Sequence, residues 1–286
     1  MKNFSEHNKG ILFVFSAALL WSTGGLFIKL ISFNAMQLSF FRCSIAALTF
    51  AVLFRKQILY FNKFSLINSI FYAIVLISFV IATKTTTAAN AIFLQATAPI
   101  YVLIFEPIFN KTKYEKINVI TVAVCVIGMF LFFVGEIEPS HFEGNLVALI
   151  SGITFAAFFL GMKKNEPIYQ HSSIFWGNII VAVICLPFLF ALEFISSSDL
   201  LMVSFLGVFQ IAFAYAFFSA GLKRIYAVEA SIISMIEPVL NPVWVFIGYG
   251  EIPSITAIIG GAIILTSITI RTLITGSSTI RTKFNF

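Results

Sequence analysis

One carboxylate, Glu237, stands near the middle of an apolar stretch that runs over residues 225–251, and Pro238 and Pro242 follow it. An ionisable side chain at mid-depth in a membrane is costly, so it indicates a functional site. Each proline removes a backbone donor and clashes with the preceding turn, which should kink or break the helix. A broken helix is tolerated in a bilayer only against protein or water. We therefore expect Glu237 to face a cavity.

Two kinds of chemistry are open to this carboxylate. Glu237 could bind the ammonium group of a solute, or it could carry a coupling proton, because burial disfavours the charged form of a carboxyl group. The alternative is a structural carboxyl group that bonds to a neighbouring helix. Asn241 lies one turn later and Ser234 three residues earlier, so both share a face with Glu237. Arg42 could bind a carboxylate, pair with an acid or extend to the membrane interface.

Other candidates for the wall of this cavity combine aromatic rings with a few polar groups, a composition that suits small organic ligands. Together with Arg42, Ser234, Glu237 and Asn241, the predicted substrate-binding residues are Trp21, Thr23, Gln95, Phe155, Gln210 and Tyr215. Other charged groups have simpler interpretations. Glu106, with Pro107 after it, is expected to close its helix against the cytoplasmic face. Helix-end lysines are expected to reach the interface or the C-terminal carbonyls; these are Lys29, Lys84, Lys163 and Lys223.

Composition places the whole chain in a membrane. Of 286 residues, 59% are hydrophobic and 10% are charged, whereas soluble domains carry about 25% charged residues. The three cysteines (Cys43, Cys125 and Cys185) lie in apolar runs without metal or redox spacing, so we expect buried thiols. The sequence contains no phosphate-binding loop, zinc motif or catalytic serine motif. We therefore expect no metal, no cofactor, no nucleic-acid partner and no enzymatic activity.

The membrane-spanning segments are predicted from hydropathy. Stretches of about 20 apolar residues are typical of membrane helices. Ten occur, at residues 10–31, 35–54, 66–83, 88–109, 117–134, 145–162, 174–192, 200–221, 227–248 and 255–273. The predicted fold class is therefore an all-α integral membrane protein with ten helices and short connections.

Charge predicts the orientation. If the N-terminus is cytoplasmic, 15 of the 18 basic residues fall on the cytoplasmic side, and the outer helix ends hold only Lys29 and Lys84. This bias follows the positive-inside rule. We expect both termini, including a short basic tail at residues 276–286, to be cytoplasmic.

The chain also divides into two similar halves, residues 1–139 and 140–275. The aligned positions keep their order and spacing: Gly10, Trp21 and Lys29 match Gly144, Phe155 and Lys163, and Lys84, Asn90 and Pro99 match Lys223, Glu229 and Pro238. Because five helices is an odd number, the second half must cross the membrane in the opposite sense. Many secondary transporters have such inverted repeats, with the substrate site near the midplane between them.

These motifs resemble those of the EamA-type exporters, ten-helix members of the drug/metabolite transporter superfamily. The residues that carry the resemblance are Leu20–Gly24 with Lys29, Phe41-Arg42 with Ala46-Ala47, Thr87–Ala91 through Pro99, Ala227-x2-Ala230-Ser231 through Glu237-Pro238, and Gly250-Glu251. The resemblance covers nearly the whole chain, with two departures. The acid that closes the fourth helix in the family is matched only loosely by Glu115, and Ala98 stands at the first-half position of Glu237.

The resemblance implies a transporter that moves a small organic solute by alternating access, with lipid as its surroundings. It favours export of amino acids or related metabolites across a bacterial inner membrane, by active or facilitated transport. Protons could be the coupling ion, through Glu237. One alternative is an exchanger of nucleotide-like or adenosyl compounds, in which basic residues bind an anion. A membrane-embedded receptor or enzyme is a different class, and the chain lacks the large loop or clustered catalytic groups that either would need.

Overall fold

The computed structural model describes residues 5–86, 88–132, 134, 142–191, 196–249 and 254–276, and every regular element in these ranges is helical. Nine helices in them are long and apolar enough to cross a membrane, and the apolar helix at Lys116–Leu131 is shorter. The predicted ten-helix membrane fold is confirmed. The motif at residues 250–251 and most of the predicted basic tail, residues 277–286, lie outside the described ranges.

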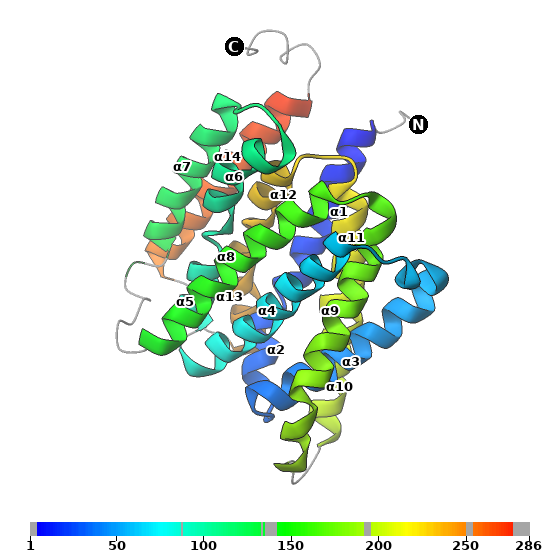
Figure 1. Cartoon of the computed structure of the whole chain (residues 1–286). Helices are drawn as coiled ribbons and strands as arrows, with labels where there is room; N and C mark the ends of the chain where they lie inside the picture. Colours follow the sequence, from blue (N-terminus) through cyan, green and yellow to red (C-terminus); the bar gives the residue numbers. More distant parts are fainter. Residues whose placement is uncertain are drawn as a thin grey trace.

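The helices pack together in one bundle (Figure 1). In the first half the helices are α1 (Glu6–Trp21), α2 (Gly24–Leu30), α3 (Ala35–Phe54), α4 (Lys63–Thr85), α5 (Ala88–Gln95), α6 (Ala98–Asn110) and α7 (Lys116–Phe132). In the second half they are α8 (Phe142–Lys164), α9 (Gln170–Cys185), α10 (Ser197–Phe205), α11 (Ala214–Leu222), α12 (Ala227–Ser234), α13 (Ile236–Tyr249) and α14 (Ile255–Gly276). Short 3₁₀ segments η1 (Arg55–Leu59), η2 (Pro167–Tyr169) and η3 (Leu186–Ala191) adjoin α3 and α9, and a π-helical segment η4 (Leu206–Phe213) joins α10 to α11.

Several predicted spans are two helices with a break between them. The fourth span breaks between α5 and α6, and the ninth breaks at Met235, between α12 and α13. Pro99 and Pro238 therefore fall in the first turns of α6 and α13, where a missing backbone donor is tolerated. Of the kink or break predicted at the prolines, the helix shows no break at Pro242, since α13 continues through this residue. The first span is also broken, between α1 and α2, which the sequence analysis did not anticipate.

The π-helical segment η4 lies unusually close to α3. Gly207 permits this approach, since a Cβ atom built on it would lie 2.6 Å from the Cβ of Ile45 and 2.8 Å from the carbonyl oxygen of Arg42. π-Helical turns interrupt helices and are frequent at functional sites. This packing brings Gln210, inside η4, to the same level of the bundle as Arg42 on α3.

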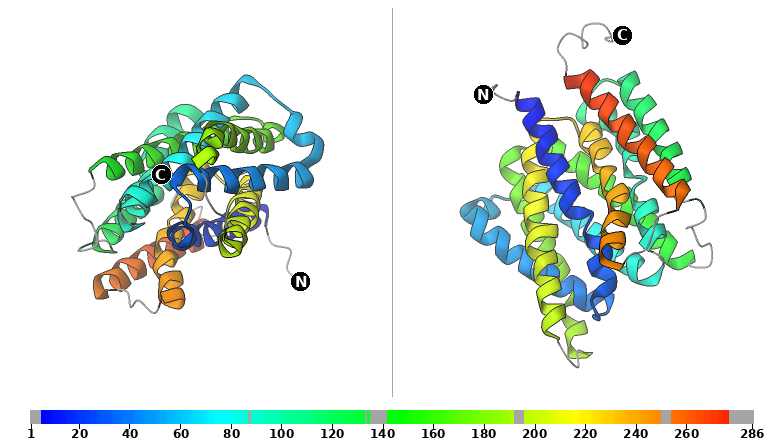
Figure 2. Two further views of the ribbon diagram at one scale, coloured as in Figure 1. Left: turned by 90° about the horizontal axis from the view of Figure 1, so that it is seen from below. Right: turned by 180° about the vertical axis from the view of Figure 1, so that it is seen from behind.

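Both chain termini lie at one end of the bundle, called the terminal end below (Figure 1). Helix α12 lies at the centre of the fold, and all eight of its residues are buried. Helices α7 and α14 run side by side at the periphery (Figure 2). The buried core of the bundle therefore surrounds the α12–α13 break, close to Glu237.

Candidate functional site

Two small adjoining pockets lie between the broken helices, with volumes of about 20 Å³ and 30 Å³. Gln95, Phe155 and Glu237 line both of them, so we treat the two as one central cavity. Pro99 and Pro238 line its first part, as expected if the fourth and ninth spans meet at the same depth. Each part is large enough for about one or two water molecules.

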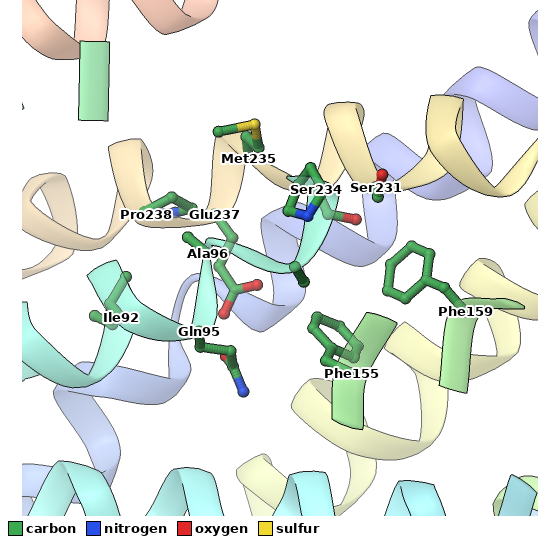
Figure 3. Close-up of a pocket in the computed structure, with 12 residues that line it drawn as sticks. Ile92, Gln95, Ala96, Phe155, Phe159, Ser231, Ser234, Met235, Glu237 and Pro238 are labelled. Atoms are coloured by element: carbon green, nitrogen blue, oxygen red, sulfur yellow. The ribbon is translucent and has the colours of Figure 1, made fainter. Parts of the chain in front are cut away.

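Glu237 stands in the first turn of α13, and its carboxylate points across the cavity toward Gln95 and Phe155 (Figure 3). The side chain is partly exposed to the cavity. In the part of the chain that the structure describes, no protein group donates a hydrogen bond to this carboxylate. The first-turn position supplies a favourable helix dipole, and among the described residues the carboxylate forms no ion pair. The carboxylate is therefore able to bind a group that enters the cavity.

Arg42 lies on α3 and contributes a cation to the same cavity. Its side chain is 1% exposed, and one Nη donates to the carbonyl oxygen of Leu76 at 2.9 Å. The Nε–H is buried and has no hydrogen-bond partner. Among the described residues no acid pairs with it, and its burial excludes extension to the membrane interface. Of the three roles considered for Arg42, binding an anionic group is the one that this geometry favours.

Two further residues of the cavity wall carry unused polar atoms. The indole Nε1–H of Trp21 and the amide Oε1 of Gln210 are buried without a hydrogen-bond partner. Trp21 is fixed by aromatic packing, with ring centroids 4.9 Å from Tyr215 and 5.7 Å from Phe155. Gln95, in contrast, already donates to the hydroxyl of Ser151 at 2.7 Å. The cavity therefore offers two free donors and one free acceptor in addition to the Glu237 carboxylate.

The structure brings most of the predicted site residues to this cavity. Those that line it are Trp21, Arg42, Gln95, Phe155, Gln210, Tyr215, Ser234 and Glu237. Thr23 lies elsewhere, with its hydroxyl on the carbonyl oxygen of Leu20 at the α1–α2 break. Asn241 is 5% exposed and packs on Gly25, where a Cβ atom would lie 2.5 Å from its amide nitrogen. Thr23 therefore bonds within its own span, and Asn241 packs α13 against α2.

Among the wall residues that the sequence did not indicate are Ser231, Phe159 and Phe79. Two of them had a usable signal. Ser231 precedes Ser234 by three residues, and Phe159 follows Phe155 by four, so each shares a helix face with a residue that was predicted. Phe79 comes from α4, and its spacing gave no such indication.

Three of the four helix-end lysines donate hydrogen bonds to backbone carbonyl oxygens. Lys29 donates to the carbonyl oxygen of Thr86 at 3.2 Å and Lys84 to that of Ile31 at 2.7 Å. Lys163 donates to the carbonyl oxygens of Leu222 and Ile225 at 2.9 and 2.7 Å. Burial and the adjacent Arg224 cation lower the pKa of Lys223, whose Nζ lies 3.5 Å from Nε2 of His171. The contacts of Lys29, Lys84 and Lys163 match the expected pairing of lysines with helix C-termini, whereas Lys223 contacts a side chain instead.

The carboxylate of Glu106 also binds backbone. Its two oxygens accept hydrogen bonds from the N–H groups of Ala227 and Val228, each at 2.7 Å. Glu106 thus closes against the first turn of α12, in the other half of the chain. Among the described residues, no group of three or more His, Cys, Asp or Glu side chains is placed to hold a metal ion.

A bundle of membrane-crossing helices, with breaks that meet at a buried polar cavity, is the architecture of a membrane transporter. The comparisons with known proteins agree. The model of the EamA-like transporter family matches residues 8–134 and again residues 142–273. The chain therefore belongs to the EamA-like transporter family, and it is an integral membrane protein.

Individual relatives support this assignment. An uncharacterized transporter of Archaeoglobus fulgidus is 24% identical over 89% of this chain and 93% of its own length. The uncharacterized inner membrane transporter YicL of Salmonella typhimurium is 26% identical over 80% of this chain and 84% of its own. A solved crystal structure matches 93% of this chain and 97% of its own with a TM-score of 0.80 at 17% identity, which supports the fold.

Proposed function

We propose that this protein is a secondary transporter that exports amino acids and related zwitterionic metabolites by alternating access. The proposal places it in a bacterial inner membrane with both termini in the cytoplasm. The positive-inside charge pattern and the location in the name of the Salmonella relative support this placement. We place the boundary between the two repeats between residues 139 and 140, a position flanked by the two family matches.

The observation that carries the proposal is the pairing of opposite charges with unused polar atoms in one cavity. Arg42 and the Trp21 indole offer free donors, which suit a solute carboxylate. Glu237 and the free Oε1 of Gln210 offer acceptors, which suit a solute ammonium group. Buried polar atoms without partners are unfavourable. A zwitterion would satisfy both sets at once without adding net charge to the cavity.

The small size of the cavity supports alternating access. Its two parts, of about 20 and 30 Å³, are too small for an amino acid. The helices around them must therefore separate to admit a solute. The α5–α6 and α12–α13 breaks lie beside the cavity and interrupt the backbone hydrogen bonds there, so they are suitable hinges.

We propose Glu237 as the proton-coupling group. The carboxylate lies at the cavity wall without a fixed cation or hydrogen-bond donor among the described residues. It can therefore take up a proton in one conformation and lose it in the other, as the surroundings of the cavity change.

The geometry gives less support to an exchanger of nucleotide-like compounds. Such a substrate needs several cations near the cavity, and Lys29, Lys84 and Lys163 already donate to backbone carbonyls. Among the described residues, Arg42 is the cation that lines the cavity. An amino acid, with one carboxylate, fits this supply of charge better.

The proposal is tested by counterflow in proteoliposomes, with a panel of labelled amino acids, their carboxamides and adenosyl compounds. We expect saturable exchange of a subset of the amino acids and little of the carboxamides, which lack the group for Arg42. Exchange restricted to adenosyl or nucleotide-like compounds would overturn the substrate class.

The same liposomes test coupling. A pH gradient should drive accumulation by the wild-type protein, and Glu237→Gln should abolish that accumulation while leaving the protein folded. The matched control is Glu143→Gln, which changes an exposed carboxylate at the start of α8. Gradient-driven accumulation by Glu237→Gln at the wild-type level would exclude this residue as the coupling group.

A further inference from the structure

A second compartment, with a volume of about 470 Å³, lies at the terminal end of the bundle. It is lined by α6, by the loop to α7 and by the start of α12, through residues that include Leu103, Glu106, Tyr226 and Val228. This compartment is much larger than the central cavity and plays no part in the zwitterion site described above.

The two compartments lie along one seam between α6 and α12. On α6, Pro99 lines the central cavity, and Leu103 and Glu106, four and seven residues later, line the terminal compartment. On α12, Ser231 and Ser234 line the central cavity, and Val228 lines the terminal compartment. These spacings of three, four and seven residues keep each set on one helix face. A solute that moved along this seam would pass directly from one compartment to the other.

Glu106 closes the seam between them. Its side chain is 1% exposed, and its oxygens accept from the N–H groups of Ala227 and Val228 at 2.7 Å each. Helix α12 lacks a side-chain cap of its own, since Tyr226 stands at the N-cap position without such a bond. Glu106 therefore satisfies N–H groups that the helix cannot satisfy internally. The bonds are charge-assisted and favoured by the helix dipole.

A second side chain fixes the turn between the end of α11 and the start of α12, which is called the corner before α12. Lys163, from α8, donates to the carbonyl oxygens of Leu222 and Ile225, immediately before that helix. The corner is thus held to α8 by a cation and to α6 by an anion. When α6 and α12 separate, the contact with α8 can persist, whereas the contact with Glu106 must break.

We propose that Glu106 is the latch of the transporter at the terminal end: its contact with α12 holds the seam closed, and its release joins the central cavity to the terminal compartment. This inference rests on the proposed alternating-access function and names the residue that controls one of its two gates. Glu106 acts through the position of α12 and is a positioning residue, since it does not line the central cavity. Once released, its carboxylate would be hydrated in the terminal compartment.

The latch is tested by the accessibility of the central cavity. Ser234→Cys places a thiol in the cavity wall, and a charged, membrane-impermeant thiol reagent is added to one side of proteoliposomes at a time. A protease-cleavable tag on the C-terminus identifies the terminal side. The native cysteines are buried, so the chain without Ser234→Cys gives the background for every variant.

With Glu106→Ala, labelling of Ser234→Cys from the terminal side should rise about tenfold, as expected for the loss of charge-assisted bonds to a buried group. Labelling from the opposite side should stay equal or fall. Glu106→Gln keeps a carbonyl acceptor and should give an intermediate rise. Glu115→Gln is the matched control, because Glu115 lines the same compartment but bonds to Asn118; its effect should stay below about twofold.

Unchanged terminal-side labelling in both Glu106 variants would overturn the latch, and so would an equal rise on both sides. If Glu106→Ala does not yield folded protein, the milder Glu106→Gln variant decides by the same criterion. The assay needs no substrate, so its failure and a failure of the counterflow experiment are separate results.

Discussion

The two ends of the molecule repeat the same backbone contacts with different side chains. At the terminal end, the corner before α12 receives Lys163 at the carbonyl oxygen of Ile225. At the opposite end, the corner before α5 receives Lys29 at the carbonyl oxygen of Thr86. In the alignment of the two halves, Lys29 matches Lys163 and Thr86 matches Ile225. The two corners are therefore held by equivalent hydrogen bonds.

A close glycine contact is repeated as well. A Cβ atom on Gly10 would lie 2.7 Å from Cγ2 of Ile225, and one on Gly144 would lie 2.8 Å from Cβ of Thr86. In each case the glycine comes from the other half of the chain than the corner it touches. Backbone approach and lysine capping therefore follow the repeat.

The side chains one turn further on differ. At the opposite end, Asn90 donates to the amide oxygen of Asn145 at 2.8 Å, and both bond to the hydroxyl of Thr86. At the terminal end the position of Asn90 is taken by Glu229, which is ion-paired with Arg271 on α14 and contacts His7 at 3.0 Å. The opposite end is held by neutral amides and the terminal end by buried charges. The two ends thus share the position of their backbone contacts but not the kind of side chain that holds them.

The largest expected difference between the two ends is the loss of stability when one partner of a buried polar contact is removed. Arg271→Ala would take away the arginine that is ion-paired with the buried carboxylate of Glu229, which is 1% exposed, and would leave its contact with the histidine His7. Such a change costs about 3–5 kcal/mol. Asn145→Ala, at the neutral end, removes hydrogen bonds without stranding a charge and should cost about 1–3 kcal/mol. The measurement is the free energy of unfolding of both variants in the same detergent.

A double replacement tests whether the stability lost in Arg271→Ala comes from the buried carboxylate that this variant leaves without its arginine. Glu229→Leu combined with Arg271→Met removes both charges and keeps similar volumes, so it should recover most of the stability lost in Arg271→Ala. If the double variant is no more stable than Arg271→Ala, or if Asn145→Ala is equally damaging, the contrast between a charged and a neutral end fails.

The glycine contacts should give equal effects at the two ends. Gly10→Ala and Gly144→Ala each force a methyl group to within 3 Å of the facing corner, and such overpacking costs about 1–3 kcal/mol. Gly248→Ala is the control, because its nearest neighbour, Cδ2 of Leu26, would lie at 3.5 Å, an ordinary contact. Thermal unfolding of the three variants should show two similar losses and no loss for the control. A loss at only one end would show that the halves are not packed equivalently.

The sequence was sufficient for the spans because length and hydropathy are local properties. The third helix, α3, coincides with the predicted 35–54 stretch. The first helix begins earlier than predicted, at Glu6, because the hydroxyl of Ser5 caps its polar first turn. The α1–α2 break was missed because no proline marks it. Instead, Ser22 and Thr23 turn their hydroxyls onto the carbonyls of the preceding turn.

The contents of the site were only partly predictable. Glu237 could be assigned to a cavity because a buried carboxylate is unusual wherever it occurs in a membrane span. The alternatives for Arg42 remained open because they depend on neighbours such as Leu76, which lies on another helix. The partner of Glu106 could not be predicted either. Its carboxylate oxygens accept hydrogen bonds from N–H groups that are 121 and 122 positions away in the sequence. Spacing along one helix cannot identify such contacts.

The smallest expected difference concerns the two equivalent lysines. Lys163 donates two hydrogen bonds to its corner, at 2.9 and 2.7 Å, whereas Lys29 donates one, at 3.2 Å. Lys163→Met and Lys29→Met both keep the apolar stem of the side chain, so their comparison isolates the ammonium group. Because one hydrogen bond contributes about 1 kcal/mol, Lys163→Met should lower the free energy of unfolding by about 1 kcal/mol more than Lys29→Met does. Equal losses would mean that the second hydrogen bond of Lys163 adds nothing to the stability of the terminal end, and a larger loss for Lys29→Met would contradict the expected order.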